Sequence, residues 1–125
     1  MDEYSISRLH GGAALDEVAA LEAASFTNPW SREMLARDLR NTDVARVYVL
    51  RNPEGRLLAF CACWLVADEL HINTLAVKAE ARRRGLATKL LRFVLAEASA
   101  AGATRAKSEY REVARVSQVR EVQLR

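Results

Sequence analysis

The sequence predicts a single α/β domain built around a mixed β-sheet. The spacing of apolar residues changes from a helical period to strand-like alternation near residue 44, and it returns to a helical period near residue 84. No repeat, linker or low-complexity stretch interrupts the 125 residues, a length that suits one compact domain. We therefore expect residues 1–125 to form one domain.

Turn chemistry separates the elements, because Gly, Pro, Asn and Asp cluster between the periodic stretches. The long apolar run at 57–66 indicates a strand buried on both faces. Beyond residue 111 valines recur at every third position, which favours a short amphipathic helix over a strand. In chain order we expect a strand at 4–9, helices at 13–25 and 32–40, strands at 44–50, 57–66 and 70–78, a helix at 84–100 and a strand at 104–111.

Composition narrows the class of protein. A net charge of +3 and an isoelectric point near 9.2 fit an anionic small ligand, an acidic partner or no special partner, and are too weak to indicate nucleic acid. The N-terminus lacks a signal-peptide core, and no apolar run reaches the roughly 20 residues that span a bilayer. Cys61 and Cys63 face the same side of a strand and have no metal-ligating neighbours, so we expect buried thiols, no metal, no membrane contact and a cytoplasmic location.

One segment carries a chemical signal. Arg82-Arg83-Arg84-Gly85-Leu86-Ala87-Thr88 follows a predicted strand and opens a predicted helix. A helix N-terminus offers unpaired amides and a partial positive charge, and Gly85 with the small Ala87 lets a phosphate approach the backbone. An ordinary basic turn before a helix explains the arginine run alone equally well.

The order of these residues resembles the (Arg/Gln)-x-x-Gly-x-(Gly/Ala) motif of the GNAT N-acetyltransferases, here Arg82-x-x-Gly85-x-Ala87. The resemblance implies a GNAT fold in which Arg82, Arg83 and the following loop hold the pyrophosphate of acetyl-CoA. It also implies that the preceding strand lines the pantetheine arm. The residues implied to bind acetyl-CoA are Leu75, Ala76, Val77, Arg82, Arg83, Arg84, Gly85, Leu86, Ala87 and Thr88.

Two further segments resemble the RimI-type enzymes of this superfamily, which acetylate the N-terminal alanine of a ribosomal protein. They are residues 25–31, with a Pro-Trp-Ser turn, and residues 63–69, which lead into the next strand. The likeness spans roughly residues 4–111. It implies a protein N-terminus, such as that of a ribosomal protein, as acceptor, and it places Glu109 in the position of the general base.

The family pattern is lost after Arg111, so residues 112–125 form a divergent or truncated tail without the usual last strands. Ala114 falls where the family has a CoA-contacting asparagine, and Glu121 falls where it has a tyrosine acid. Two alternatives stay open: a catalytically weak acetyl-CoA-binding module, and an enzyme for a small-molecule amine. The favoured interpretations of Trp30 and Trp64 are core aromatics, and that of His71 is a paired sheet residue.

Overall fold

The structure is a computed structural model that describes residues 3–10, 12, 14–108 and 121–123. Within these residues the centre of the molecule is a six-stranded sheet in the order β1-β2-β3-β4-β5-β6. The strands are β1 (Ser5–Arg8), β2 (Ala45–Arg51), β3 (Leu57–Val66), β4 (Glu69–Val77), β5 (Arg105–Ser108) and β6 (Glu121–Gln123). Neighbouring strands are antiparallel except β4 and β5, which are parallel. The predicted mixed, mostly antiparallel sheet is confirmed.

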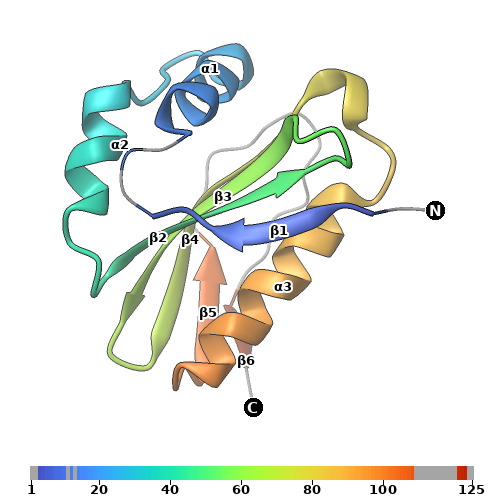
Figure 1. Cartoon of the computed structure of the whole chain (residues 1–125). Coiled ribbons are helices and arrows are strands. Elements are labelled where there is room, and N and C mark those ends of the chain that lie inside the picture. The colour runs from blue at the N-terminus through green and yellow to red at the C-terminus, as the bar shows by residue number, and fades with distance from the viewer. Residues whose placement is uncertain (1–2, 11, 13, 109–120, 124–125) are drawn as a thin grey trace.

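Helices cover both faces of the sheet (Figure 1). α1 (Leu15–Ser25) and α2 (Arg32–Leu39) lie on one face. α3 (Leu86–Ala100) lies on the other, after a single 3-10 turn η1 (Ala79–Ala81). The β4–η1–α3 segment therefore crosses from the sheet to the face opposite α1 and α2.

The central strand β3 is buried on both faces, as its unbroken apolar run predicts. Because successive side chains of a strand point to opposite faces, Phe60 and Ala62 join the apolar cluster under α1 and α2. Cys61 and Cys63 join the cluster under α3 and are fully buried free thiols. A hydrogen bond with Cys63, together with burial, raises the pKa of the Cys61 thiol well above its usual value.

Local chemistry explains where the helices begin. The Ser31 hydroxyl accepts a hydrogen bond from the Met34 amide at 3.1 Å, so it caps α2 as its sequence position predicts. α3 begins at Leu86, two residues later than expected, because Gly85 adopts a left-handed conformation with φ 76° and serves as the N-cap. None of the helices in the described residues is long and apolar enough to cross a lipid bilayer.

The end of the chain corrects one expectation. The valine spacing favours a helix beyond residue 111, but residues 121–123 form β6, which pairs with β5 along Arg105–Lys107. The expected helix is wrong at these three residues. The outer edge of β5, which the lost family pattern would leave open, is therefore covered along this stretch. Residues 109–120, including the end of the strand expected at 104–111, lie outside the described residues.

Candidate functional site

The backbone amides of residues 83–85, between η1 and α3, have no hydrogen-bond acceptor in the part of the chain that the structure describes. Arg83 and Gly85 both adopt left-handed conformations, with φ 66° and 76°. Among the described residues none accepts a hydrogen bond from the amides of residues 83–88, whereas the Lys89 amide bonds to the Gly85 carbonyl at 3.0 Å. Alternating backbone conformations of this kind turn successive N–H groups toward one point and form an anion-binding concavity. The helix dipole adds positive potential at the same place.

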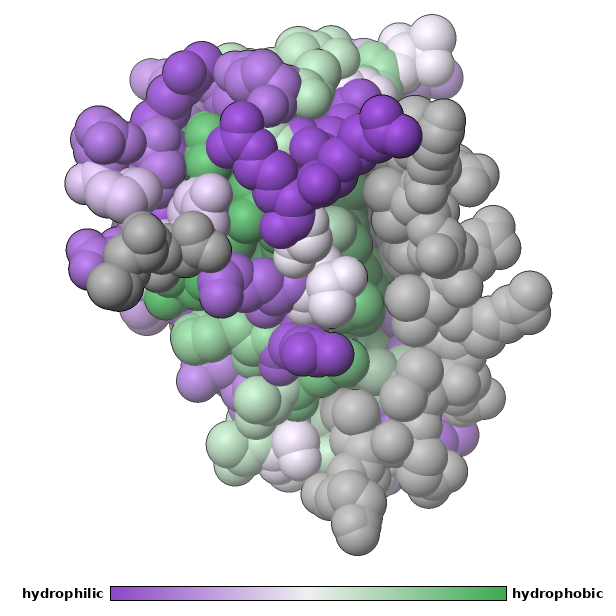
Figure 2. All heavy atoms as spheres, turned by 90° about the vertical axis from the view of Figure 1, so that its right-hand side faces the viewer, coloured by the Kyte–Doolittle hydropathy of each residue, from purple (hydrophilic) through white to green (hydrophobic). Residues whose placement is uncertain are grey.

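Positive side chains surround this concavity and also shape it. The Arg82 Nε donates to the Val77 carbonyl at 3.0 Å, which ties the loop to the end of β4. The Arg84 guanidinium donates to the Glu80 carbonyl at 3.2 Å. Figure 2 shows hydrophilic residues gathered at the top of this side of the molecule, where η1 and the start of α3 lie, above apolar surface.

The nearest acidic side chain, Glu80, is directed to a partner outside the loop. Its carboxyl group lies 2.8 Å from the Arg56 guanidinium. A backbone hydrogen bond within Glu80 lowers the pKa of this carboxyl group, and the charges of Arg56, Lys78 and Arg84 lower it further while burial opposes the shift. The negative charge of Glu80 is thus compensated, and the loop keeps a positive balance.

Strand β4 leads straight to the loop and has an unpaired edge in the described part of the chain. Its pairing with β5 runs from Glu69 to Ile72 and goes no further among the described residues. A β-bulge lies at the same point, since Ile72 is opposite Cys63 and Thr74 is opposite Ala62, leaving Asn73 without a partner in β3. The Asn73 Nδ2 is buried without a hydrogen-bond partner among the described residues.

The predicted pantetheine-lining residues follow this bulge. The side chains of Leu75 and Val77 enter the apolar cluster under α3, and that of Ala76 enters the cluster under α1 and α2. Leu86 is likewise a core residue, 3% exposed. These residues can therefore serve a ligand along the β4 edge only through their backbone groups, whereas Arg83, Gly85 and Thr88 lie in the exposed or half-exposed loop and first turn of α3.

A polar cluster that the sequence did not indicate lies where β4 and β5 meet. Glu69 contacts His71 through Oε1, at 3.0 Å from Nε2, and contacts Arg105 of β5 through Oε2. His71 therefore has the bonded sheet position that its sequence pattern favours. In the sequence Glu69 stands out only as the last residue of the 63–69 segment, because its two partners depend on the β4–β5 register.

A second group missed by the sequence is the buried Glu22 of α1, whose Oε2 accepts a hydrogen bond from the Trp30 amide at 2.8 Å. Trp30 packs against the apolar cluster under α1 and α2, as expected of a core aromatic. Trp64 donates through Nε1 to the Asp38 carboxyl group of α2, at 2.9 and 3.2 Å from its two oxygens.

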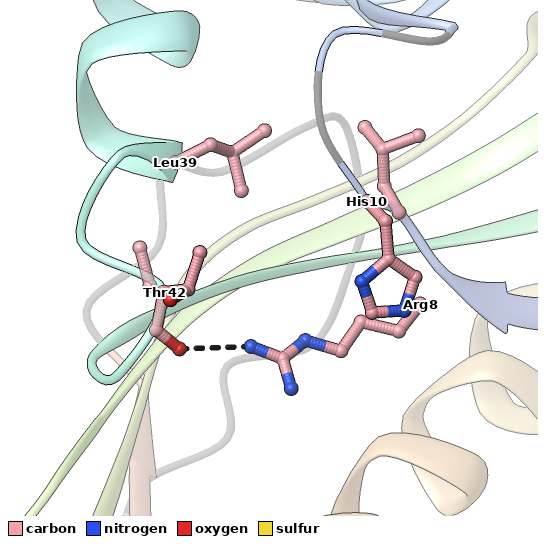
Figure 3. A pocket seen from close by; sticks show the side chains of 6 residues that line it. Arg8, His10, Leu39 and Thr42 are labelled. Atoms are coloured by element: carbon pink, nitrogen blue, oxygen red, sulfur yellow. Dashed lines mark hydrogen bonds between the residues drawn. The ribbon is translucent and has the colours of Figure 1, made fainter.

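A hollow lies beside the end of α2, next to the Trp64–Asp38 pair (Figure 3). It has a volume of about 320 Å³, and it is lined by the end of β1 and by the segment that joins α2 to β2. The Arg8 guanidinium donates to the Thr42 carbonyl at 3.0 Å across it. None of the predicted site residues that the structure describes lines this hollow.

Two further predictions concern the general base and metal binding. Glu109, the residue in the position of the general base, lies outside the described residues. Among the residues that are described, no group of three or more His, Cys, Asp or Glu side chains is placed to hold a metal ion.

Comparisons with a protein family, a curated protein and solved structures all indicate one family. Residues 15–115 match the model of the acetyltransferase (GNAT) family. A putative [ribosomal protein bS18]-alanine N-acetyltransferase from Bacillus subtilis (strain 168) is 33% identical over 78 residues, which is 62% of this chain and 51% of that protein. The chain thus spans about half the length of this curated relative.

Solved structures share the fold at lower identity. The ribosomal-protein-S18-alanine N-acetyltransferase from Escherichia coli superposes with a TM-score of 0.76 at 24% identity, covering 85% of this chain and 66% of that one. A GNAT family N-acetyltransferase from Escherichia coli, solved in complex with CoA, gives 0.71 at 20% identity and covers 86% and 63%. The family model, which matches most of the chain, and these folds together show that the chain belongs to the acetyltransferase (GNAT) family.

Proposed function

We propose that this chain transfers the acetyl group of acetyl-CoA to the N-terminal α-amino group of a protein, with the N-terminal alanine of a ribosomal protein as the favoured acceptor. The observation that carries the proposal is the row of amides at 83–88, which have no acceptor among the described residues and lie between the end of β4 and the start of α3. Among the same residues, the edge of β4 that leads to them is paired with β5 only as far as Ile72. Relatives named for ribosomal-protein-alanine acetylation support the acceptor.

Each part of the site has a defined task in this reaction. The amides of residues 83–88 bind the pyrophosphate, with charge from Arg83 and Arg84, while Arg82 holds the loop on β4 through Val77. The backbone of Leu75–Val77 pairs with the pantetheine arm, and an amide of this edge donates to the thioester oxygen, where negative charge develops. Acetyl-CoA supplies an activated acyl group with a thiolate as leaving group.

The acceptor must arrive as a free amine, because an ammonium group has no lone pair. An α-amino group has a pKa near roughly 8, so a carboxyl group acting directly or through water can remove its proton near neutral pH. We assign this role to Glu109. The amine nitrogen then forms a bond to the carbonyl carbon and the carbon–sulfur bond breaks. The proton that the nitrogen loses in becoming an amide is passed on, directly or through water, to the departing thiolate.

The test has two stages. Calorimetric titration with acetyl-CoA measures binding, and thiol release with an Ala-initiated peptide then measures transfer. The same peptide with a blocked α-amino group is the control. Release with the free peptide alone supports the proposal, whereas equal release with both peptides would indicate another amine acceptor. Absence of binding would contradict the assigned site.

A Glu109→Gln variant tests the base. We expect transfer to slow by about 10²- to 10⁴-fold with acetyl-CoA affinity nearly unchanged, because a lost general base affects only proton removal. Glu112→Gln, which changes the next carboxyl group along the chain, is the matched control. A large loss of acetyl-CoA binding in Glu109→Gln would contradict the role.

The divergence after Arg111 favours one second candidate, an acetyl-CoA-binding module with weak or no transfer. Ala114 and Glu121 replace the asparagine and tyrosine that the family resemblance calls for. Normal acetyl-CoA binding without release of thiol would support this candidate over the enzyme.

A further inference from the structure

One buried side chain holds the turn between α1 and α2. Glu22 lies in the last turn of α1 and is 1% exposed. Its carboxyl Oε2 accepts the hydrogen bond of the Trp30 amide at 2.8 Å, and its backbone carbonyl accepts that of the Phe26 amide at 3.1 Å. Glu22 therefore fixes both ends of the turn at 26–30.

The position is unfavourable for an acidic side chain. The last turn of a helix presents carbonyl groups with partial negative charge, which disfavour a carboxyl group nearby. Complete burial adds a desolvation penalty that only hydrogen-bond partners can offset. An apolar residue would suit the core between Val18, Leu21 and the sheet, but it would leave the Trp30 amide without this acceptor. The role of Glu22 is thus to shape the turn.

The α1–α2 turn lies on the face of the sheet opposite α3. Phe26 and Trp30 pack against the apolar cluster that contains Ala76 of β4, and α1 contacts β4. α3 lies on the opposite face, and η1 before it lies at the end of the sheet (Figure 1). If acetyl-CoA lies along the β4 edge with its phosphates at the start of α3, its acceptor must approach from the side of α1 and α2.

We propose that Glu22 is a positioning residue for the acceptor: by holding the Trp30 amide it fixes the α1–α2 turn as one wall of the acceptor groove. This inference rests on the proposed function and identifies what sets acceptor affinity at the same site. Glu22 is buried and acts through Trp30, so its loss should change the KM for the acceptor far more than the affinity for acetyl-CoA.

The unmodified protein already offers a test of the contact. The Trp30 amide should exchange with deuterium at least about tenfold more slowly than an exposed turn amide, because it is hydrogen-bonded to a buried group. Exchange as fast as that of the Glu54 amide, which is exposed and has no acceptor among the described residues, would overturn the inference without any substitution when both are measured by NMR.

Variants then separate positioning from folding. Glu22→Leu removes the acceptor of the Trp30 amide, Glu22→Gln keeps an oxygen in the same place, and Glu17→Leu is the matched control. Glu17 is a half-exposed carboxyl group on the same helix, paired with Arg51 at 2.9 Å. We expect Glu22→Leu to raise the peptide KM by about tenfold or more, with acetyl-CoA affinity within about twofold, because small displacements of a substrate-positioning wall have large effects.

The two remaining variants show whether an oxygen at position 22 is sufficient and whether any lost carboxyl group on α1 has the same effect. Glu22→Gln should restore the peptide KM to within about threefold of the unmodified protein, and Glu17→Leu should leave it unchanged. An unchanged KM in a folded Glu22→Leu, or an equal loss of acetyl-CoA affinity, would overturn the inference. If Glu22→Leu does not fold, the exchange of the Trp30 amide in the unmodified protein decides the inference: slow exchange supports the contact with Glu22, and exchange as fast as that of a free turn amide overturns it.

Failure of the proposed function gives a different result. In that case the unmodified protein would bind acetyl-CoA and release no thiol with the Ala-initiated peptide. Trp30 fluorescence in a Trp64→Phe background would still show whether Glu22 holds the turn. Stronger acrylamide quenching in Glu22→Leu than in Glu17→Leu would support the contact, and equal quenching would overturn it.

Discussion

Two turns that lead into helices are built in opposite ways in this molecule. The loop before α3 leaves the amides of residues 83–88 without acceptors among the described residues, and two of its residues, Arg83 and Gly85, are left-handed. Around the turn before α2, two amides have acceptors within the protein: Trp30 donates to the buried Glu22 carboxyl group, and Met34 in the first turn of α2 donates to the Ser31 hydroxyl. Amides without an internal acceptor are available to bind an anion, whereas amides bonded within the protein hold a turn in one conformation.

The largest expected effect on acetyl-CoA affinity comes from a change in the loop before α3, here called the open loop. Gly85→Ala adds one methyl group at φ 76°, where no atom of the described residues lies within 4 Å of the new Cβ. The methyl group would occupy the space through which a phosphate approaches the amides. We expect acetyl-CoA affinity to fall by at least about tenfold in calorimetry, while stability falls by only about 1 kcal/mol from backbone strain.

Gly55→Ala is the matched control for this variant. Gly55 also has a positive φ of 88° and open space around its Cβ position, but it lies in the turn between β2 and β3. The two variants share the same backbone strain, so a similar loss of stability is expected. Equal loss of acetyl-CoA affinity in both would show that the loop before α3 has no special role.

This contrast also explains what could be predicted from the sequence. The backbone geometry of the loop before α3 could be predicted, because a local run of Arg, Gly and Ala marks the start of a helix whose first amides have no partner within it. Of the turn before α2, here called the closed turn, only one of the two hydrogen bonds could be predicted. Ser31 caps a helix that begins next to it, but the partner of Glu22 lies eight residues away and depends on how the chain folds back.

The sheet shows the same division. Residues 57–66 were predictable as a buried strand because an unbroken apolar run needs no knowledge of its partners. β6 was not predictable, because a strand of three residues exists through its pairing with β5, and the valine spacing favoured a helix there. The contacts of Glu69 with His71 and Arg105 similarly depend on the register of β4 and β5.

A smaller effect is expected at the closed turn. Ser31→Ala removes the hydroxyl group that accepts the Met34 amide, so the first turn of α2 loses its cap. We expect the free energy of unfolding, measured by urea titration, to fall by about 1 kcal/mol, with acetyl-CoA affinity unchanged. Ser31→Asp should retain stability, since aspartate also caps helices. A tenfold loss of acetyl-CoA affinity in Ser31→Ala would contradict the separation of the two turns.

The smallest effect concerns the contact that holds α3 on the sheet, and with it the open loop. The ring of Tyr48 on β2 lies edge-on to that of Phe93 on α3, with centroids 6.0 Å apart. Burial raises the pKa of Tyr48 above its usual value of 10.0, whereas the hydrogen bond from Arg46 and its charge act to lower it. Above pH 10 the unfolded chain therefore loses this proton before the folded one does, so stability falls as pH rises toward the folded pKa.

Tyr48→Phe keeps the ring contact and removes the titrating group. The lost hydrogen bond from Arg46 should lower the free energy of unfolding of the variant by a similar amount at every pH. In addition, the variant should lack the part of the loss of stability at alkaline pH that the Tyr48 hydroxyl causes in the unmodified protein. The difference between the two proteins should thus narrow by less than about 1 kcal/mol between about pH 8 and about pH 10.5 in urea titrations. A constant or widening difference would contradict the assignment of the alkaline decrease to Tyr48. Acetyl-CoA affinity near pH 8 should be the same in both, because the ring that seats α3, and so fixes the free amides at its start, is retained.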